Sequence, residues 1–251
     1  MPAFADEFDG TTLNTEVWVP HYLPARSSRE ASAAAYEVRD SYLRLYIPAD
    51  HPVWCPGVHE PPLRVSGIQS GSWSGPVGST QGQQPFRDGL TVQEEQLSHW
   101  GWTPHYGRIG MRARATVSPR SMVALWLSGL ENVPERSAEI CVTEMFGDAV
   151  EPGLSAAVGL GLHSFRDPNV AEDFETVRLP LEIEDWHEYA VDWGPDRVDF
   201  LVDGQTVKSC EGPPNYPVQL MLAVFDFPHR SVGNGDGLVP ELLVDWIRGY
   251  S

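Results

Sequence analysis

The sequence predicts an all-β fold, a sandwich built from many short strands. Its 251 residues include 23 Gly, 22 Pro and 26 aromatic residues, made up of 9 Trp, 8 Tyr and 9 Phe. Short apolar stretches stand between turn residues, and hardly any amphipathic run reaches helical length, which is typical of a sandwich. No change in composition divides the chain. We therefore expect a single domain over residues 1–251, large enough to bury a sizeable core.

Charge and cysteine content limit the classes of partner. The formal net charge of −18 argues against a nucleic-acid or anionic-membrane partner, because both require a positive face. Cys55, Cys141 and Cys210 are too widely spaced for a disulfide framework or a metal cluster, which leaves Cys55 with Cys210 as one open pairing. The chain opens without the regions of a signal peptide, and no apolar run approaches membrane-spanning length. We therefore expect a soluble chain.

Turn signals divide the predicted strands. Phe4 to Trp18 is expected to be extended, with a turn at Asp9-Gly10. Tyr36 to Pro48 predicts two strands joined by a tight turn at Asp40-Ser41, although the alternation of its second half is imperfect. Asp203-Gly204, which follows a short apolar strand, is a strong hairpin signal.

Residues 50–106 are the least regular part of the chain, rich in Pro, Gly, Ser and Gln, with a strand-like island at 65–70. So long a poorly patterned stretch in a compact domain is typical of functional loops. Its rings either stack on the apolar face of a sugar or fill a satellite core, and both interpretations stay open. They are Trp54, His59, Trp73, His99, Trp100, Trp102 and His105.

From Tyr106 onward the strands are clearer. They are expected at 106–117, 122–128, 137–147, 156–165, 186–193, 198–202 and 219–225. Side chains alternate between the two faces of a strand, so Ala124, Trp126 and Ser128 share one face and Trp126 is a candidate cleft residue. By the same alternation Phe225 follows Gln219 toward the cleft.

The strand at 137–147, Ser-Ala-Glu-Ile-Cys-Val-Thr-Glu-Met-Phe-Gly, carries two glutamates where a buried strand would normally carry none. In a flat strand Glu139 and Cys141 face one side and Glu144 the other. A β-bulge at Val142-Thr143 would return Glu144 to the face of Glu139, and bulges are common beside active sites. We therefore expect two carboxylates to line one cleft.

Paired carboxyl groups are the minimum equipment for cleaving a glycosidic bond. With roughly 5 to 5.5 Å between them, one attacks the anomeric carbon while the other serves as acid and then base; a wider gap inverts the sugar. The alternative is a sheet-edge strand whose glutamates are merely solvated. His163, on the following strand, could hydrogen-bond a sugar or tune Glu144, or it could be a structural histidine.

These residues carry a family resemblance. Glu139-Ile-Cys-Val-Thr-Glu144 resembles the Glu-x-Asp-x-x-Glu signature of glycoside hydrolase family 16, the laminarinase-like β-glucanases and their relatives. Further segments resemble the same family in the same order, over most of the chain except residues 50–106. These are Asp6–Gly10, Tyr106–Arg114, Ala124–Leu127, His187–Trp193, Phe200–Gly204 and Val244–Arg248.

The resemblance implies a concanavalin A-like β-jelly-roll sandwich with a concave cleft, and a retaining mechanism on β-linked polysaccharide. It places Glu139 as nucleophile and Glu144 as acid/base. It also implies substrate contacts for Trp126, His163, Trp193 and Phe225. Catalysis would need no cofactor. A structural calcium on the convex side would involve Glu7 and Asp245, because hard oxygen ligands suit that ion.

Two positions depart from the family pattern. Cys141 replaces the middle acid of the signature, so both a like charge and a hydrogen-bond partner of the glutamates are missing, with opposite expected effects on Glu139. Cys141 as a catalytic nucleophile is a further alternative, but no cationic neighbour in sequence would produce its thiolate. Ala223 replaces a common Asn, and Phe225 a common Trp, which predicts altered sugar contacts.

Three functions stay open at this level. The first is a retaining endo-glycosidase on β-linked polysaccharide, with β-glucan as the leading substrate, acting as a monomer. The second is a transglycosylase on the same site. The third is a catalytically silent carbohydrate-binding protein, suggested by Cys141. The compartment is also open, since family members are commonly secreted whereas this chain starts at Met1 without a signal.

Overall fold

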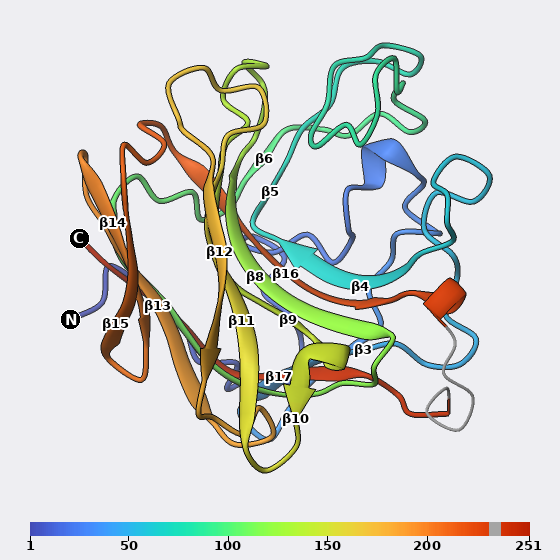
Figure 1. Cartoon of the computed structure of the whole chain (residues 1–251). Helices are drawn as coiled ribbons and strands as arrows, with labels where there is room; N and C mark the ends of the chain where they lie inside the picture. Colours follow the sequence, from blue (N-terminus) through green and yellow to red (C-terminus); the bar gives the residue numbers. More distant parts are fainter. Residues whose placement is uncertain (231–236) are drawn as a thin grey trace.

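Two stacked antiparallel sheets form the protein in the computed structural model, which describes residues 1–230 and 237–251 (Figure 1). The expected all-β jelly-roll sandwich is confirmed. Helical structure in the described residues is confined to three 3₁₀ turns, η1 (Pro24–Arg26), η2 (Gly147–Ala149) and η3 (Pro228–Arg230). None of the described helices is long and apolar enough to cross a membrane.

The outer sheet has the strand order β15-β14-β13-β7-β17-β3-β2, and β1 also pairs with β17. That last pairing brings the two chain termini close together (Figure 1). The strands of this sheet are β1 (Phe4–Asp6), β2 (Tyr36–Arg39), β3 (Tyr42–Tyr46), β7 (Gly107–Thr116), β13 (His187–Trp193), β14 (Arg197–Val202), β15 (Gln205–Glu211) and β17 (Glu241–Tyr250).

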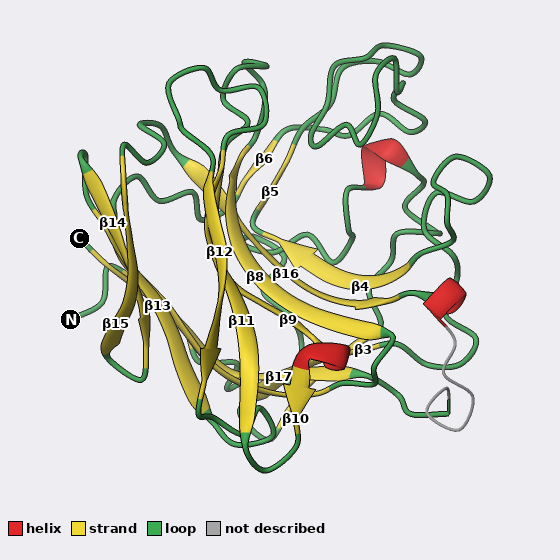
Figure 2. Ribbon diagram, viewed as in Figure 1, coloured by secondary structure: helices red, strands yellow, loops and turns green. Residues whose placement is uncertain are grey.

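The inner sheet has the order β10-β11-β9-β8-β16-β4, with β12 paired to β11. Its strands are β4 (Arg64–Gln69), β8 (Ser121–Gly129), β9 (Glu139–Phe146), β10 (Val150–Glu151), β11 (Ser155–His163), β12 (Asp173–Leu179) and β16 (Val218–Asp226). A small ribbon of β5 (Gly71–Ser72) and β6 (His99–Trp100) stands apart from both sheets. Long loops from residues 50–106 extend beside the inner sheet (Figure 2).

Alternation along the strands separates the core from the open face of the inner sheet. In β8, Val123, Leu125 and Leu127 join the main core between the sheets. Ala124 and Trp126 belong instead to a second cluster on the other face. The predicted faces of this strand are therefore confirmed.

Two hairpin turns also form as predicted. Asp40 and Ser41 have φ values of 52° and 57°, and Asp203 and Gly204 have 49° and 75°. Positive φ at both central residues is the requirement of a type I′ turn, whose twist matches that of the flanking strands.

The prediction fails for two segments. Phe4 to Trp18 was expected to be extended, but only Phe4–Asp6 forms a strand. No strand was predicted at β12, because Asp173–Leu179 is largely polar and exposed, as an edge strand allows.

The expected bulge in β9 is present. Thr143 pairs with Leu125 and Cys141 with Trp126, so Val142 is an extra residue that lacks a partner on β8. The register with β11 shifts at the same place. Because one residue is added, the side chains on either side of the bulge regain the same face.

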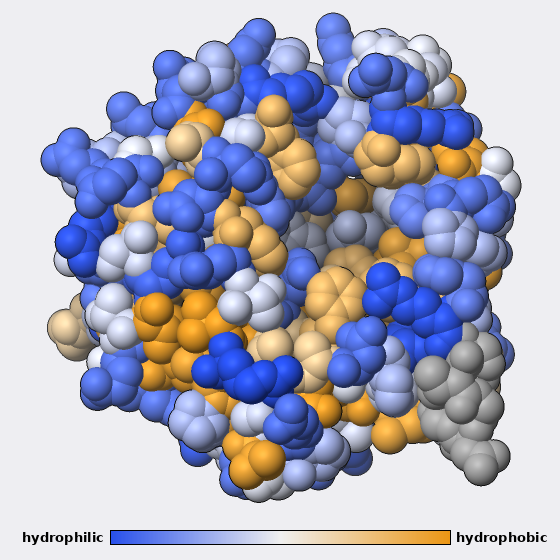
Figure 3. Space-filling model, viewed as in Figure 1, coloured by the Kyte–Doolittle hydropathy of each residue, from blue (hydrophilic) through white to orange (hydrophobic). Residues whose placement is uncertain are grey.

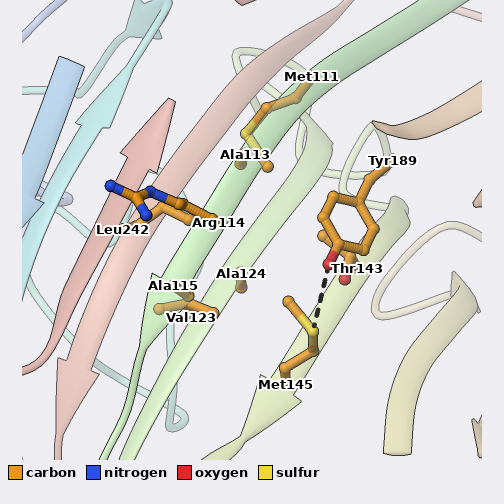
Figure 4. A pocket seen from close by; sticks show the side chains of 10 residues that line it. All are labelled: Met111, Ala113, Arg114, Ala115, Val123, Ala124, Thr143, Met145, Tyr189 and Leu242. Carbon is orange, nitrogen blue, oxygen red and sulfur yellow. Dashed lines mark hydrogen bonds between the residues drawn. The ribbon is translucent and has the colours of Figure 1, made fainter. Parts of the chain in front are cut away.

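The bulge also directs Thr143 toward the core, where a small cavity of about 10 Å³ lies between the sheets (Figure 4). Thr143 points into it, and its hydroxyl is buried with no hydrogen-bond partner. The hydroxyl of Tyr189 lies across the cavity, 3.8 Å from the sulfur of Met145. The bulge thus turns a polar residue into the core so that Glu144 can face outward.

Candidate active site

A cleft of roughly 690 Å³ lies on the open face of the inner sheet. The space-filling view shows this side of the molecule hollowed, with apolar and polar surface meeting in the hollow (Figure 3). The walls come from loops near residues 22, 54–63, 84–88 and 163–166. Six of the predicted site residues line the cleft together, namely Trp126, Glu139, Cys141, Glu144, His163 and Phe225.

Register places these side chains relative to one another. Glu139 stands opposite His163 on β11 and opposite Ser128 on β8. Glu144, beyond the bulge, stands opposite Ala124. The two carboxyl groups therefore project from one strand into the same cleft.

Burial dominates the electrostatics of the pair. Burial raises the pKa of Glu139 to about 8; the neighbouring charge of Glu144 adds to the rise, and a hydrogen bond from Ser128 opposes it. Burial also raises the pKa of Glu144, although the electrostatic interaction with His163 lowers it in part. Both carboxyl groups therefore hold protons at higher pH than ordinary glutamates.

Cys141 lies between the glutamates on the cleft floor and is almost fully buried. Burial, together with the charges of Glu144 and Glu139, raises the pKa of its thiol well above the usual range. The thiol stays protonated, so it offers no thiolate for nucleophilic attack. The three cysteines, Cys55 and Cys210 included, are free thiols.

His163 is fixed by partners outside the cleft floor. Its Nδ1 lies 2.6 Å from Oε1 of Glu172, and its ring stacks on Phe174 with centroids 4.5 Å apart. The carboxylate of Glu172 also accepts a hydrogen bond from the Ser164 amide at 2.9 Å. These contacts orient the imidazole, leaving its other ring nitrogen available to the cleft.

Aromatic rings form one side of the cleft. Tyr22 makes edge contacts with Trp54, Trp126 and Phe225 at centroid distances of 5.1, 6.3 and 5.5 Å. Phe86 packs on Trp54 at 5.5 Å. These rings therefore form a continuous aromatic wall.

The loop aromatics divide between the two roles left open by the sequence. Trp54 and His59 line the cleft. Trp102 instead stacks on Phe4 at 4.0 Å and packs against the main core.

Three polar cleft residues had no signal in the sequence. Gln84 donates from Nε2 to Glu139, and to the Ser128 hydroxyl at 3.1 Å. Glu131 accepts a hydrogen bond from the backbone N–H of Gln84 at 2.6 Å and forms an ion pair with Arg166. Each lies in a loop, where no strand alternation indicates which way a side chain points.

A family model confirms what this geometry suggests. The model described as "Glycosyl hydrolases family 16" matches residues 101–232, which is 132 of the 251 residues. The chain belongs to glycosyl hydrolase family 16. The match includes β7 to β9, β11 and β16, and thus the whole floor of the cleft apart from β4.

Solved structures show the same fold for this family 16 chain. It superposes on the GlcNAcα1-4Gal releasing endo-β-galactosidase from Clostridium perfringens with a TM-score of 0.79 at 24% identity, over 100% of this chain and 64% of that one. The laminarinase from Flavobacterium sp. UMI-01 gives 0.64 at 18% identity, over 100% of both chains. The laminarinase catalytic domain from Thermotoga petrophila RKU-1 gives 0.66 at 16%, over 100% and 97%. No curated protein sequence matches the chain.

Trp193 does not reach the cleft of this family 16 chain. It lies in β13 of the outer sheet, 2% exposed, within the main core. Its nearest ring is that of Tyr106, at a centroid distance of 5.1 Å. A substrate contact of Trp193 was inferred from motif position alone, and its burial between the sheets contradicts it.

The carboxylates expected at a calcium site are held by arginines instead. Glu7 receives two hydrogen bonds from Arg248, each 2.8 Å long, and Asp245 lies 2.5 Å from Arg112. No group of three or more His, Cys, Asp or Glu residues that could hold a metal occurs in the described part of the chain. A cation would have to displace both guanidinium groups, so these residues do not fit a calcium site.

Proposed function

We propose that this family 16 chain is a retaining, endo-acting hydrolase of β-linked polysaccharide, with Glu139 as nucleophile and Glu144 as acid/base. The bulge in β9 is the observation that carries the proposal, because it brings both glutamates to one cleft. The family membership supports glycoside hydrolysis as the reaction class.

In the first step an oxygen of ionised Glu139 attacks the anomeric carbon as the bond from that carbon to the glycosidic oxygen breaks. The departing oxygen takes the proton of Glu144. Burial raises the pKa of Glu144, so this carboxyl group keeps its proton to higher pH than an ordinary glutamate.

In the second step the carboxylate of Glu144 removes a proton from water. The water oxygen bonds to the anomeric carbon as the ester to Glu139 breaks, and Glu144 is protonated again. Two displacements at one carbon retain its configuration. A sugar hydroxyl in place of water would give transglycosylation.

The substrate proposed first is β-glucan, and β-galactoside chains are the competitor. The aromatic wall supports a sugar polymer, since pyranose faces stack on rings. Laminarinases among the similar structures support the glucan. The endo-β-galactosidase, with the higher TM-score, supports the galactoside. Each of the compared names describes an endo-acting enzyme or a laminarinase, which supports internal cleavage.

New reducing ends from laminarin, lichenan, xyloglucan, agarose and β-galactan test the proposal. We expect release by the wild type and a loss of about 10³-fold or more in Glu139→Gln. The matched control is Glu211→Gln, an exposed glutamate of β15. NMR should show the β-anomer as first product. Release of the α-anomer, or equal rates for both variants, would contradict the proposal.

A silent sugar-binding protein is the second candidate, favoured by the neutral thiol between the two glutamates. Cys141→Asp distinguishes it. Turnover only in the Asp variant, with sugar binding by the wild type, would establish that Cys141 has silenced the site.

A further inference from the structure

The loop at residues 73–98 sends one side chain to the nucleophile of the proposed reaction. Gln84 donates a hydrogen bond from Nε2 to Oε1 of Glu139 and a second, 3.1 Å long, to the hydroxyl of Ser128. Ser128 stands opposite Glu139 in the register of β8 and β9. The side-chain amide of Gln84 therefore bridges Glu139 and Ser128 on the next strand.

The backbone of Gln84 is held from two directions. On one side the fully buried guanidinium of Arg26 donates to the carbonyls of Gln83 at 2.9 Å and Leu90 at 3.1 Å. On the other side the backbone N–H of Gln84 donates a hydrogen bond to the buried carboxylate of Glu131 at 2.6 Å.

Further contacts hold these anchors. Glu131 is itself paired with Arg166. The φ of Gln84 is +41°, a conformation that non-glycine residues adopt only when their surroundings fix it. The loop thus holds the side-chain amide of Gln84 in one orientation toward Glu139.

Cys141 explains why the nucleophile needs such a partner. The signature of the family has a carboxyl group at this position, next to both glutamates, whereas the thiol here is neutral and a weak donor. A buried carboxylate that lacks a donor is poorly stabilised and poorly oriented. Gln84 approaches the same carboxylate from above the sheet rather than from within the strand.

We propose that Gln84 is a positioning residue that orients Glu139 and stabilises its ionised form, in place of the middle acid that Cys141 replaces. The inference rests on the proposed role of Glu139. It assigns the function to a loop residue outside the signature.

Other ionisable groups act on the same carboxylate and stay constant in the tests below. Glu144 and Cys141 lie on the same strand, and His163 lies on the neighbouring strand β11. Glu172 lies just before β12, and Tyr22 lies in the N-terminal segment.

The first test is kinetic, on the best polysaccharide of the panel. Gln84→Ala should lower kcat about 10- to 100-fold, with a smaller change in KM, because the nucleophile is misplaced rather than the sugar unbound. The acidic limb of its pH profile should move to higher pH, since the donor that favours ionised Glu139 is gone. Gln81→Ala, an exposed glutamine of the same loop, is the control and should change neither.

A double-mutant cycle tests the replacement itself. If Gln84 substitutes for the missing acid, the loss of activity caused by Gln84→Ala should be at least 10-fold smaller in a Cys141→Asp background than in the wild-type background. Multiplicative effects of the two substitutions, or an unmoved pH profile in Gln84→Ala, would overturn the proposal.

Thermal unfolding provides a readout that needs no turnover. Gln84→Ala should lower Tm by several degrees at pH 9, where Glu139 is ionised, and much less at pH 5. Equal losses at both pH values would mean a merely structural contact and would refute the role. If the wild type cleaves none of the polysaccharides, the proposed function fails, yet this pH-resolved difference still decides whether Gln84 stabilises ionised Glu139.

Discussion

At the scale of single residues, the site combines two glutamates with a neutral, buried thiol between them. Glu139 is buried and Glu144 is partly buried, and the burial of each carboxyl group is the largest cause of its raised pKa. Chemistry nevertheless requires one of them ionised and the other protonated. The titration of this pair therefore governs both activity and stability.

The pH dependence of activity is the first residue-scale prediction. Glu139 must lose its proton to attack, and its pKa of about 8 predicts that kcat/KM falls as pH drops below that value. Glu144 must keep its proton, and its raised pKa extends the active range upward. A bell-shaped profile is expected, with its acidic limb above the range of ordinary glutamates. A maximum below about pH 5, the range of ordinary glutamates, would contradict it.

The same shift predicts a pH-dependent gain in stability for Glu139→Gln. A carboxyl group whose pKa rises on folding stabilises the fold below its unfolded value of 4.5, and that contribution is lost as pH rises through about 8. At pH 9 the neutral variant should thus unfold at a Tm higher by several degrees, whereas at pH 4 the two proteins should match. Glu211→Gln, exposed on β15, should show no such crossover in thermal scans.

At the scale of elements, strand alternation made much of the fold predictable. It gave the faces of β8, the direction of Phe225 and the bulge in β9, because each depends on residues adjacent in sequence. It could not give Gln84 or the burial of Trp193, because those depend on contacts between segments far apart in the chain. The cleft floor was therefore predicted better than its walls.

Thr143 allows the bulge to be tested for its energetic consequence. Its hydroxyl is buried without a partner beside the small cavity. Thr143→Val removes the unpaired group while keeping the shape, and should stabilise the protein by about 1 kcal/mol, or about 2–4 °C in Tm. Thr176→Val, on the exposed edge strand β12, is the control and should stay within about 0.5 kcal/mol. A destabilised Thr143→Val would show that the hydroxyl has a partner in solution.

At the scale of the whole molecule, stability rests on the core between the sheets, while the negative charge is spread over the surface. Several ion pairs among the described residues are exposed, and such pairs contribute little. Asp226, at the end of β16, is different, because the residue is only 1% exposed. It accepts from Arg64 on β4 at 2.8 Å and from Arg120, which precedes β8, at 2.7 Å. One buried carboxylate thus ties together three neighbouring segments of the cleft floor.

Asp226→Asn should therefore destabilise the whole protein rather than one loop. Removing the charge breaks the buried ion pair with Arg64 and takes one carboxylate partner from Arg120, and breaking a buried pair typically costs about 3–5 kcal/mol. Denaturant unfolding should show a single transition at lower midpoint with unchanged slope. Asp199→Asn, which breaks an exposed pair with Arg197, should cost less than about 1 kcal/mol. Similar losses in both variants would mean that the buried carboxylate has no special role. Because Trp126 and Phe225 stand on the strands that Asp226 joins, its loss should also weaken sugar binding before the protein unfolds.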